Sequence, residues 1–481
     1  MHNRRRALSA FVVFMSFVGV ARAEVIPRLR ASWKEKDARV EVFSPDGRSL
    51  VSSGADGHRL RDTEAGDIRA LLTTRPGLVD GPMFSPDGRF LLAKVATDRH
   101  DPVRVYDLKV WDAATGKEYA SFPYVSDQLN VSTDHFALSG DGKTLAFLEN
   151  SERLPVRVKT SKMSINGWPE ITAYYNDNPD LPRVKLWDVP GRKETATLDG
   201  GSHMVFSPDG KTLISGPRDW KDPVAKVWDA ETGRLRGEFD SGGPWVKPMA
   251  FSPDGKYLAI GSAKVQVLHE LASGRKWSVA AQGWSSNGPA FSPDATLLFP
   301  SGPTRMHPGI EQGGEHTCYD LTTSPPSRLE LGSGEMIISP AGRRYAAVLG
   351  KRGSGAPLTL AIHDLPSRRE SSRLVVAGLI GADVSPDGRW LALLVGRIEA
   401  IPPGTRTRWV LEIRLYDPAT ARVLATIPSP GQTWGNYGWK FSPDGRYLAV
   451  DYRTGSNAFE PGEPDPTDRP MTLEIWELPS P

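Results

Sequence analysis

The chain has 481 residues, of which 39% are hydrophobic and 24% charged, with 47 glycines, 41 prolines and a formal net charge of +2. This composition is that of a turn-rich chain with ample length for a large hydrophobic core. The balanced charge gives no support to a nucleic acid or an acidic membrane surface as partner. The single cysteine, Cys318, excludes an intramolecular disulfide.

The first 23 residues have the pattern of an export signal. Three arginines, Arg4 to Arg6, precede the apolar stretch Ala10–Val20, and Ala21-Arg22-Ala23 is a small-x-small cleavage site. The apolar stretch is shorter than the ~20 residues that a membrane span needs, so an uncleaved anchor is the alternative interpretation. We therefore expect a signal peptide over 1–23 and a mature protein over 24–481, exported to the periplasm or the extracellular space. Removal of the signal leaves 55 basic and 57 acidic residues, a net charge of −2.

One short motif recurs along the whole mature chain. In its full form it reads Phe-Ser-Pro-Asp-Gly, as at Phe251–Gly255, and successive copies are 40 to 68 residues apart. Serine, proline, aspartate and glycine in this order suit a type I turn between two strands, because proline presets φ and glycine accepts positive φ. Three copies depart from it, with Gly140, Ala295 and Ala341 in place of proline, glycine and aspartate. The nine serines of the motif are Ser44, Ser85, Ser139, Ser207, Ser252, Ser292, Ser339, Ser385 and Ser442.

Each repeat unit predicts four strands. Apolar residues alternate before the turn, as at Val40 and Val42, and Leu50 follows it, as half-buried strands require. A third strand ends in an aromatic–acid pair, and a second turn such as Thr232-Gly233 leads to a short fourth strand. The clearest pairs are Trp111-Asp112, Trp187-Asp188, Trp228-Asp229, Tyr319-Asp320, Tyr416-Asp417 and Trp476-Glu477. We expect their aromatic rings to be packing residues.

These units resemble the WD40 and WD40-like β-propeller repeats, of the exported bacterial type, over essentially the whole mature chain. Leu50–Asp62 is similar to the second and third strands of that family, although Arg61 stands where tryptophan is common. The resemblance implies an all-β fold, a single propeller of four-stranded blades. Nine units predict nine blades, with eight as the alternative if the sixth or seventh unit forms no full blade, and two separate rings of four and five as a further one.

The two ends of the chain predict ring closure. The last unit stops at its third strand, Met471–Trp476, whereas Val25–Leu29 precede the first unit. We expect these N- and C-terminal segments to pair within one blade, which removes exposed sheet edges.

The extra residues of the longer units fall between the second and third strands. With strands named a to d from the axis outward, the largest b–c insertion is Glu149–Arg183. The resemblance implies that b–c and d–a loops open on one face, and insertions gathered on one face commonly mark a binding face. The other b–c insertions are Thr97–Arg104, Pro217–Val224, Ser301–His316, Gly350–Pro357, Gly396–Arg408 and Arg453–Pro470.

Aromatic and arginine side chains of these loops suit contact with a protein or peptide. We take them as candidate binding residues, with a cover over the blade tops as the alternative role. They are Trp168, Tyr174, Tyr175, Trp220, Trp245, Trp284, Trp409, Trp434, Arg99, Arg305, Arg406 and Arg408.

No catalytic motif accompanies the repeat. The sequence has no Gly-x-Ser-x-Gly elbow, no His-Glu-x-x-His and no phosphate-binding glycine loop ahead of a helix. We therefore expect no enzyme, no cofactor and no metal; the residues around His307, His316 and Cys318 fit no standard zinc spacing, and Cys318 is expected to be buried and inert.

The sequence predicts a non-catalytic binding or scaffold module. Its expected partner is a protein or peptide, with a polysaccharide as the alternative ligand; no nucleic acid is expected, no membrane span remains after signal cleavage, and the oligomeric state is left open. The rival prediction is a propeller enzyme of hydrolase, lactonase or lyase type with a site at the channel mouth. A structural part of an envelope assembly is the third. The enzyme would need convergence of His100, Asp101, His135, His203 and His307.

Overall fold

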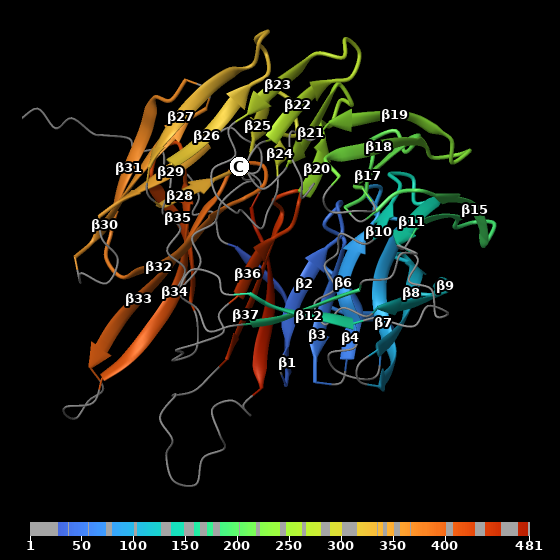
Figure 1. Cartoon of the computed structure of the whole chain (residues 1–481). Coiled ribbons are helices and arrows are strands. Elements are labelled where there is room, and N and C mark those ends of the chain that lie inside the picture. The colour runs from blue at the N-terminus through green and yellow to red at the C-terminus, as the bar shows by residue number, and fades with distance from the viewer. Residues whose placement is uncertain are drawn as a thin grey trace, which may run out of the picture.

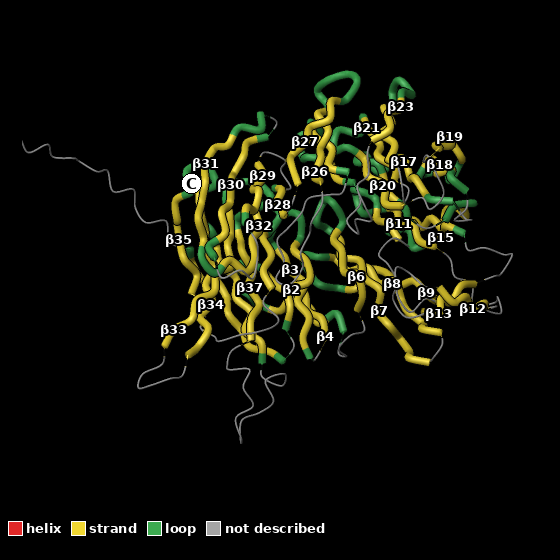
Figure 2. Tube along the Cα trace, turned by 60° about the vertical axis from the view of Figure 1, so that its left-hand side comes forward, coloured by secondary structure: helices red, strands yellow, loops and turns green. Residues whose placement is uncertain are grey.

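The computed structural model describes residues 27–479 apart from several gaps. These are 37, 56, 74–78, 101–102, 127–135, 149–157, 164–170, 177–182, 202, 218–221, 241–246, 262–265, 280–288, 301–314, 334, 340–343, 351–355, 366, 401–406, 429–437 and 454–469. The described residues form strands and turns and contain no helix (Figure 2). None of them lies in an apolar helix long enough to cross a bilayer.

Nine four-stranded antiparallel sheets follow one another around a ring, and each is one blade (Figure 1). Blades 1 to 4 take up the N-terminal half of the chain. Blade 1 is β2 (Arg39–Phe43), β3 (Ser49–Gly54), β4 (Gly57–Asp62) and β5 (Ile68–Leu71); blade 2 is β6 (Val79–Phe84), β7 (Phe90–His100), β8 (Val103–Asp112) and β9 (Glu118–Ser126). Blade 3 is β10 (Phe136–Leu138), β11 (Thr144–Leu148), β14 (Val184–Asp188) and β15 (Lys193–Leu198); blade 4 is β16 (Val205–Phe206), β17 (Thr212–Ser215), β18 (Val224–Asp229) and β19 (Leu235–Asp240).

Blades 5 to 9 have the same strand order. Blade 5 is β20 (Lys247–Phe251), β21 (Tyr257–Gly261), β22 (Gln266–Glu270) and β23 (Lys276–Val279); blade 6 is β24 (Ala290–Phe291), β25 (Leu297–Phe299), β26 (Glu315–Asp320) and β27 (Ser327–Ser333). Blade 7 is β28 (Glu335–Ile338), β29 (Arg344–Leu349), β30 (Leu358–Asp364) and β31 (Glu370–Val376); blade 8 is β32 (Leu379–Val384), β33 (Leu391–Ala400), β34 (Thr407–Asp417) and β35 (Arg422–Pro428). Blade 9 is β36 (Gly438–Phe441), β37 (Tyr447–Arg453), β38 (Met471–Glu477) and β1 (Arg28–Glu35). The sixth and seventh units both form full blades, so nine blades are confirmed and eight is wrong.

The recurrent motif forms the a–b turn of each blade. In blade 1 the Gly47 N–H donates to the Ser44 carbonyl at 2.9 Å, and Gly47 has a φ of +69°. The Ser44 hydroxyl donates to Asp46 Oδ1 at 2.6 Å and accepts the Ser49 N–H at 2.9 Å. All nine motif serines are at most 8% exposed, so these serine side chains are buried beneath their turns. The sixth unit makes the same turn with Ala295 at a φ of +57°.

The ring closes by pairing of the two ends of the chain, as predicted. Strand β1 pairs antiparallel with β38 from Arg28 opposite Glu477 to Glu35 opposite Met471. In Figure 1 the red last blade accordingly lies beside the blue first blade. The predicted segment Val25–Leu29 starts and ends too early: the pairing strand is Arg28–Glu35, which shares Arg28 and Leu29 with it, and Val25 and Ile26 lie outside the described residues.

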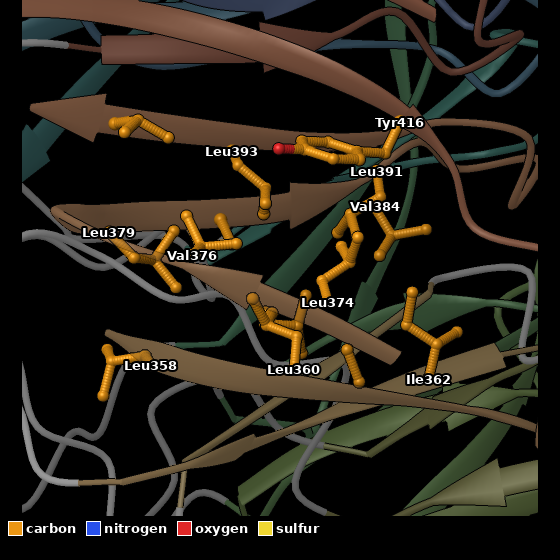
Figure 3. Packing of buried hydrophobic residues seen from close by; sticks show 14 residues of the cluster. Leu358, Leu360, Ile362, Leu374, Val376, Leu379, Val384, Leu391, Leu393 and Tyr416 are labelled. Carbon is orange, nitrogen blue, oxygen red and sulfur yellow. The ribbon is translucent and has the colours of Figure 1, made fainter. Parts of the chain in front are cut away.

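The hydrophobic core is divided among the blade interfaces. Nine clusters of buried residues exist, one between each pair of neighbouring blades, and the cluster of Val40, Leu50, Ala449, Leu473 and Ile475 joins blade 9 to blade 1. Figure 3 shows the cluster between blades 7 and 8, where side chains of β30 and β31 meet those of β32 and β33. Each blade therefore depends on both neighbours for burial of its two faces.

A candidate binding face and the seam beside it

Extra residues lengthen the b–c connections of every blade except 1 and 5, whereas the connections at the other end of the sheets are short. Because neighbouring strands are antiparallel, b–c connections lie at one end of every blade, and a–b and c–d turns lie at the opposite end. We call these the insert face and the turn face. On the turn face each described a–b turn is the same tight motif, closed by a hydrogen bond from the glycine or Ala295 N–H to the serine carbonyl.

Three of the predicted b–c insertions contain regular structure. The pair β7–β8 runs on to His100 opposite Val103, and β33–β34 runs on to Ala400 opposite Thr407. The insertion between β11 and β14 contains β12 (Val158–Met163) and β13 (Ile171–Asn176), which form a two-stranded sheet of their own. The loops predicted at Thr97–Arg104 and Gly396–Arg408 are therefore mostly extended hairpins, a correction that follows from continued strand pairing.

Five of the candidate binding residues lie on these inserts. The register places Tyr174 and Tyr175 on β13 opposite Thr160 and Lys159, and Arg99 on β7 opposite Arg104. Arg408 and Trp409 lie on β34 opposite Glu399 and Ile398. Their backbones are placed, but their side chains lie outside the described part. Entirely outside the described residues are Trp168, Trp220, Trp245, Trp284, Trp434, Arg305 and Arg406.

The third-strand aromatics are packing residues, as expected. Trp111 is 3% exposed and Trp228 5% exposed, and Trp187 packs against Phe122 at a ring centroid distance of 4.7 Å. The Trp228 Nε1–H donates to the hydroxyl of Ser215 at 3.0 Å on the neighbouring b strand. This bond satisfies the polar edge of a buried indole.

A buried polar cluster at the seam between blades 9 and 1 was missed in the sequence analysis. Asp451 on β37 is 7% exposed, and its Oδ2 accepts the Val40 N–H at 3.2 Å. Lys440 Nζ donates to the Glu41 carbonyl, while the Ser53 hydroxyl donates to Glu41 Oε1 at 2.6 Å. The only signal in the sequence was an aspartate at a position where the other second strands carry mainly apolar or small residues.

The charge state of this cluster follows from its burial. Burial raises the pKa of the Asp451 carboxyl, although the Val40 and Gly438 N–H groups and Lys440 oppose the shift. On β4 of blade 1, burial also lowers the pKa of His58, against the influence of the Glu41 carboxylate. Both shifts disfavour the charged form. The N–H groups that Asp451 binds belong to Val40 of blade 1 and Gly438 of blade 9, so its carboxyl group connects the two blades across the seam.

The residues of the rival enzyme prediction stay untested. His203 is half-buried and has a φ of +64°, whereas the side chains of His100, Asp101, His135 and His307 lie outside the described part. Within the described ranges no group of three His, Cys, Asp or Glu side chains is arranged to hold a metal ion. Cys318 is fully buried in the cluster between blades 6 and 7, as expected, and burial raises its pKa to about 12.

Comparisons with known proteins found relatives that match parts of the chain. No family model matches the chain. It is 30% identical over 123 residues to nuclear distribution protein nudF of Aspergillus niger, covering 24% of this chain and 27% of nudF. It is 23% identical over 365 residues to Periodic tryptophan protein 2 of Arabidopsis thaliana, covering 65% of this chain and 39% of that protein. Both relatives are WD40 proteins, and the chain spans well under half the length of each.

Two solved structures are also similar. A eukaryotic initiation factor gives a TM-score of 0.49 at 16% identity, over 80% of this chain and 86% of that one. Hydrazine synthase of Kuenenia stuttgartiensis gives a TM-score of 0.31 at 21% identity, over 52% of this chain and 72% of that one.

Proposed function

Because the chain is a WD40-like β-propeller, we propose that it is a non-catalytic binding or scaffold module that engages a protein or peptide through its insert face. The WD40 relatives support an interaction role in general terms. The choice of face and of a peptide-like partner is our proposal.

The observation that carries the proposal is the asymmetry between the two faces. Strand pairs β7–β8 and β33–β34 extend on the insert face, and β12–β13 adds a separate small sheet there. The turn face carries tight turns whose polar groups are already bonded to one another. Additional chain on one face of a repeat protein is the usual location of recognition, because it is free to vary without disturbing the stacked blades.

The experiment removes the insert sheet and keeps the blade. Residues 158–176 are replaced by a short Gly-Ser linker, which leaves the pairing of β11 with β14 intact because β12 and β13 take no part in the blade 3 sheet. The matched control changes three exposed residues of the turn face together, Lys117→Ala, Arg234→Ala and Arg275→Ala. Proximity labelling from all three proteins then gives three sets of neighbours. We expect proteins that are enriched with the unchanged protein and the control to disappear with the insert deletion. Equal sets for the deletion and the unchanged protein would overturn the assignment of the face.

We also propose that the protein acts after export. The support is the signal-like pattern of residues 1–23, which lie outside the described residues. Mass spectrometry of the intact protein from its native host tests this, with Glu24 as the expected first residue. A protein that keeps Met1 and stays in the cytosol would contradict export and leave the binding proposal standing.

A further inference from the structure

Blades 4 and 5 enclose a cleft of about 400 Å³ that opens on the turn face. Apolar side chains of both blades line it, Ile214, Val227 and Phe239 of blade 4 and Phe251 and Leu271 of blade 5, together with polar and charged ones, Ser207, Asp209, Thr212, Arg236 and Asp254. The core between these two blades is correspondingly small. Only Ile214, Ala225, Leu258 and Ile260 are fully buried in it, whereas six hydrophobic side chains around them are only partly buried. These six are Val205, Val227, Phe239, Met249, Phe251 and Leu271.

The turn glycines show that this gap is particular to blade 5. A Cβ built on Gly47 would lie 2.8 Å from Asp444 Oδ1 of the preceding blade, and one built on Gly445 would lie 2.3 Å from Asp387 Oδ2. The same atom built on Gly88, Gly142, Gly210 or Gly388 also meets the preceding blade within 4 Å. A Cβ on Gly255, the corresponding residue of blade 5, meets nothing within 4 Å. Of the a–b turn glycines that the structure describes, Gly255 alone faces open space.

The outer strand of blade 4 lacks a methyl group that other blades place against the next blade. In blades 9, 1 and 3 an alanine of the outer strand contacts the c–d turn glycine of the next blade. A Cβ on that glycine would lie 2.4 Å from Ala31, 2.4 Å from Ala70 and 2.3 Å from Ala196, respectively. In the register of blade 4 the corresponding residue is Gly237, opposite Val227. Neither Gly237 nor Gly274, the c–d turn glycine of blade 5, has an atom within 4 Å of a built Cβ.

One carboxylate at the mouth of the cleft, that of Asp209, has an oxygen available to a ligand. Asp209 is exposed at the lining, and its Oδ1 accepts the Ser207 hydroxyl at 2.6 Å and the Lys211 N–H at 3.1 Å. Both of these hydrogen bonds go to Oδ1, and among the described residues none is made to Oδ2. The one arginine of the lining, Arg236, is already paired with Asp229, and Asp254 lies 3.1 Å from Lys256 Nζ. Attraction by Lys211 contributes to the lowered pKa of Asp209, so the mouth of the cleft presents an exposed carboxylate with one lysine near it.

From these observations we propose that the cleft between blades 4 and 5 binds a short peptide segment, with an aromatic or branched aliphatic side chain between Phe239 and Phe251 and a basic residue beside it on Asp209. The volume is at the small end of the range of about 300–1,000 Å³ typical of ligand pockets, which suits two adjacent side chains. The site lies on the face opposite the inserts and stands independently of the function proposed above.

The test uses the full chain and a heptapeptide, Gly-Ser-Phe-Leu-Lys-Ser-Gly, titrated by isothermal calorimetry. Two control peptides carry glycine in place of phenylalanine or glutamate in place of lysine. Gly237→Leu adds a side chain next to the cleft without removal of any contact, because Gly237 lies opposite the lining residue Val227 and has open space at its Cβ position. Since glycine weakens a strand interior, this variant should melt at the same temperature or higher.

We expect saturable binding of the heptapeptide to the unchanged protein and a loss of about tenfold or more in Gly237→Leu. Asp209→Asn keeps the turn and should weaken binding by about threefold, the range of an exposed ion pair. No saturable binding, equal binding to Gly237→Leu, or equal binding of the glutamate peptide would each overturn the proposal. If Gly237→Leu melts at a lower temperature than the unchanged protein, the test rests on Asp209→Asn. Unchanged affinity of Asp209→Asn for the lysine peptide would then overturn the proposal.

Discussion

The guanidinium of Arg61 lies 4.2 Å from the ring centroid of Trp33, and this contact joins the first blade to the last. Trp33 belongs to β1, the N-terminal strand that completes blade 9, and Arg61 is the last residue but one of the third strand of blade 1. The Arg61 Nε–H donates to the Ser52 hydroxyl at 3.0 Å, the same bond that Trp228 makes to Ser215 in blade 4. Arginine thus replaces the usual tryptophan here and adds a cation–π contact across the seam.

Removal of the carboxylate beside this contact should destabilise the seam. Glu35 Oε1 lies 2.5 Å from Arg59 Nη1, its Oε2 lies 3.7 Å from Arg61 Nη2, and the Glu35 side chain is 14% exposed. Glu35→Gln removes the negative charge that faces two nearly buried guanidinium groups, so we expect a loss of about 3–5 kcal/mol in unfolding free energy. Urea denaturation measures it. Lys34→Gln, at the exposed neighbouring position, is the control and should change little; equal effects of the two would contradict the role of Glu35.

The a–b turns predict opposite effects for two reciprocal substitutions. Gly255 has a φ of +71° with open space at its Cβ position, and Ala295 occupies the same turn position at +57°. Gly255→Ala should therefore lose about 1 kcal/mol and Ala295→Gly should gain about 1 kcal/mol, because only the left-handed backbone is at stake. Gly47→Ala should lose more than Gly255→Ala, since its Cβ would lie 2.8 Å from Asp444 Oδ1. Thermal denaturation of the three variants tests this order.

Ionisation of the Asp451 carboxyl should destabilise the seam between blades 9 and 1 as the pH rises. Burial raises its pKa in the folded protein, so the folded state holds the proton over a pH range in which the unfolded state, with an ordinary value near 3.9, has released it. Stability from this group is therefore present below the unfolded value and is lost as the pH rises through the folded value. Asp451→Asn removes that loss and keeps an oxygen for the Val40 N–H. The melting temperature of the variant relative to the unchanged protein should increase from pH 4 to pH 7; a decrease would contradict the direction of the shift.

Cys318 should be unreactive in the folded protein. It is fully buried, and a pKa raised to about 12 keeps the thiol neutral, whereas the thiolate is the reactive form. Ellman's reagent should detect no thiol in the native protein and one per chain in concentrated guanidinium chloride, since the chain has a single cysteine. Rapid labelling of the native protein would show that the interface between blades 6 and 7 opens.

The repeat, the turn and the closure could be predicted from the sequence because each depends on local chemistry. Serine, aspartate and glycine at fixed offsets specify the turn whatever surrounds it, and Ala295 shows that the turn persists without glycine. The outer strand β1 was misplaced because its inward-facing residues, Ala31, Trp33 and Glu35, include a charged one. Ser32 and Lys34 stand between them, so the segment shows no clear alternation of apolar and polar residues. Glu35 faces inward because β1 pairs with β38 and because the arginines of blade 1 provide a partner for its carboxylate.

The positions of the inserts could be predicted from the sequence, but their strand structure could not. Length variation between second and third strands located the inserts, but continued pairing of β7 with β8 and of β33 with β34 depends on register, which loop composition did not reveal. Asp451 and the cleft at Gly237 depend on contacts between blades. An alignment of the outer strands, with Ala31, Ala70 and Ala196 against Gly237, is the one sequence signal that would have indicated the cleft.

A disulfide between the two ends of the chain tests the closed nine-bladed ring most directly. Lys34 lies opposite Thr472 in the β1–β38 pair, and directly opposed residues of antiparallel strands are close enough for a cysteine bridge. The double variant Lys34→Cys/Thr472→Cys is oxidised in dilute solution, with Lys226→Cys/Glu238→Cys in the β18–β19 hairpin as the control pair. We predict that both proteins form an intramolecular bridge, seen as a reduction-sensitive monomer band of altered mobility. A control pair that bridges while the terminal pair stays reduced, or links two chains into a dimer, would contradict the closed ring.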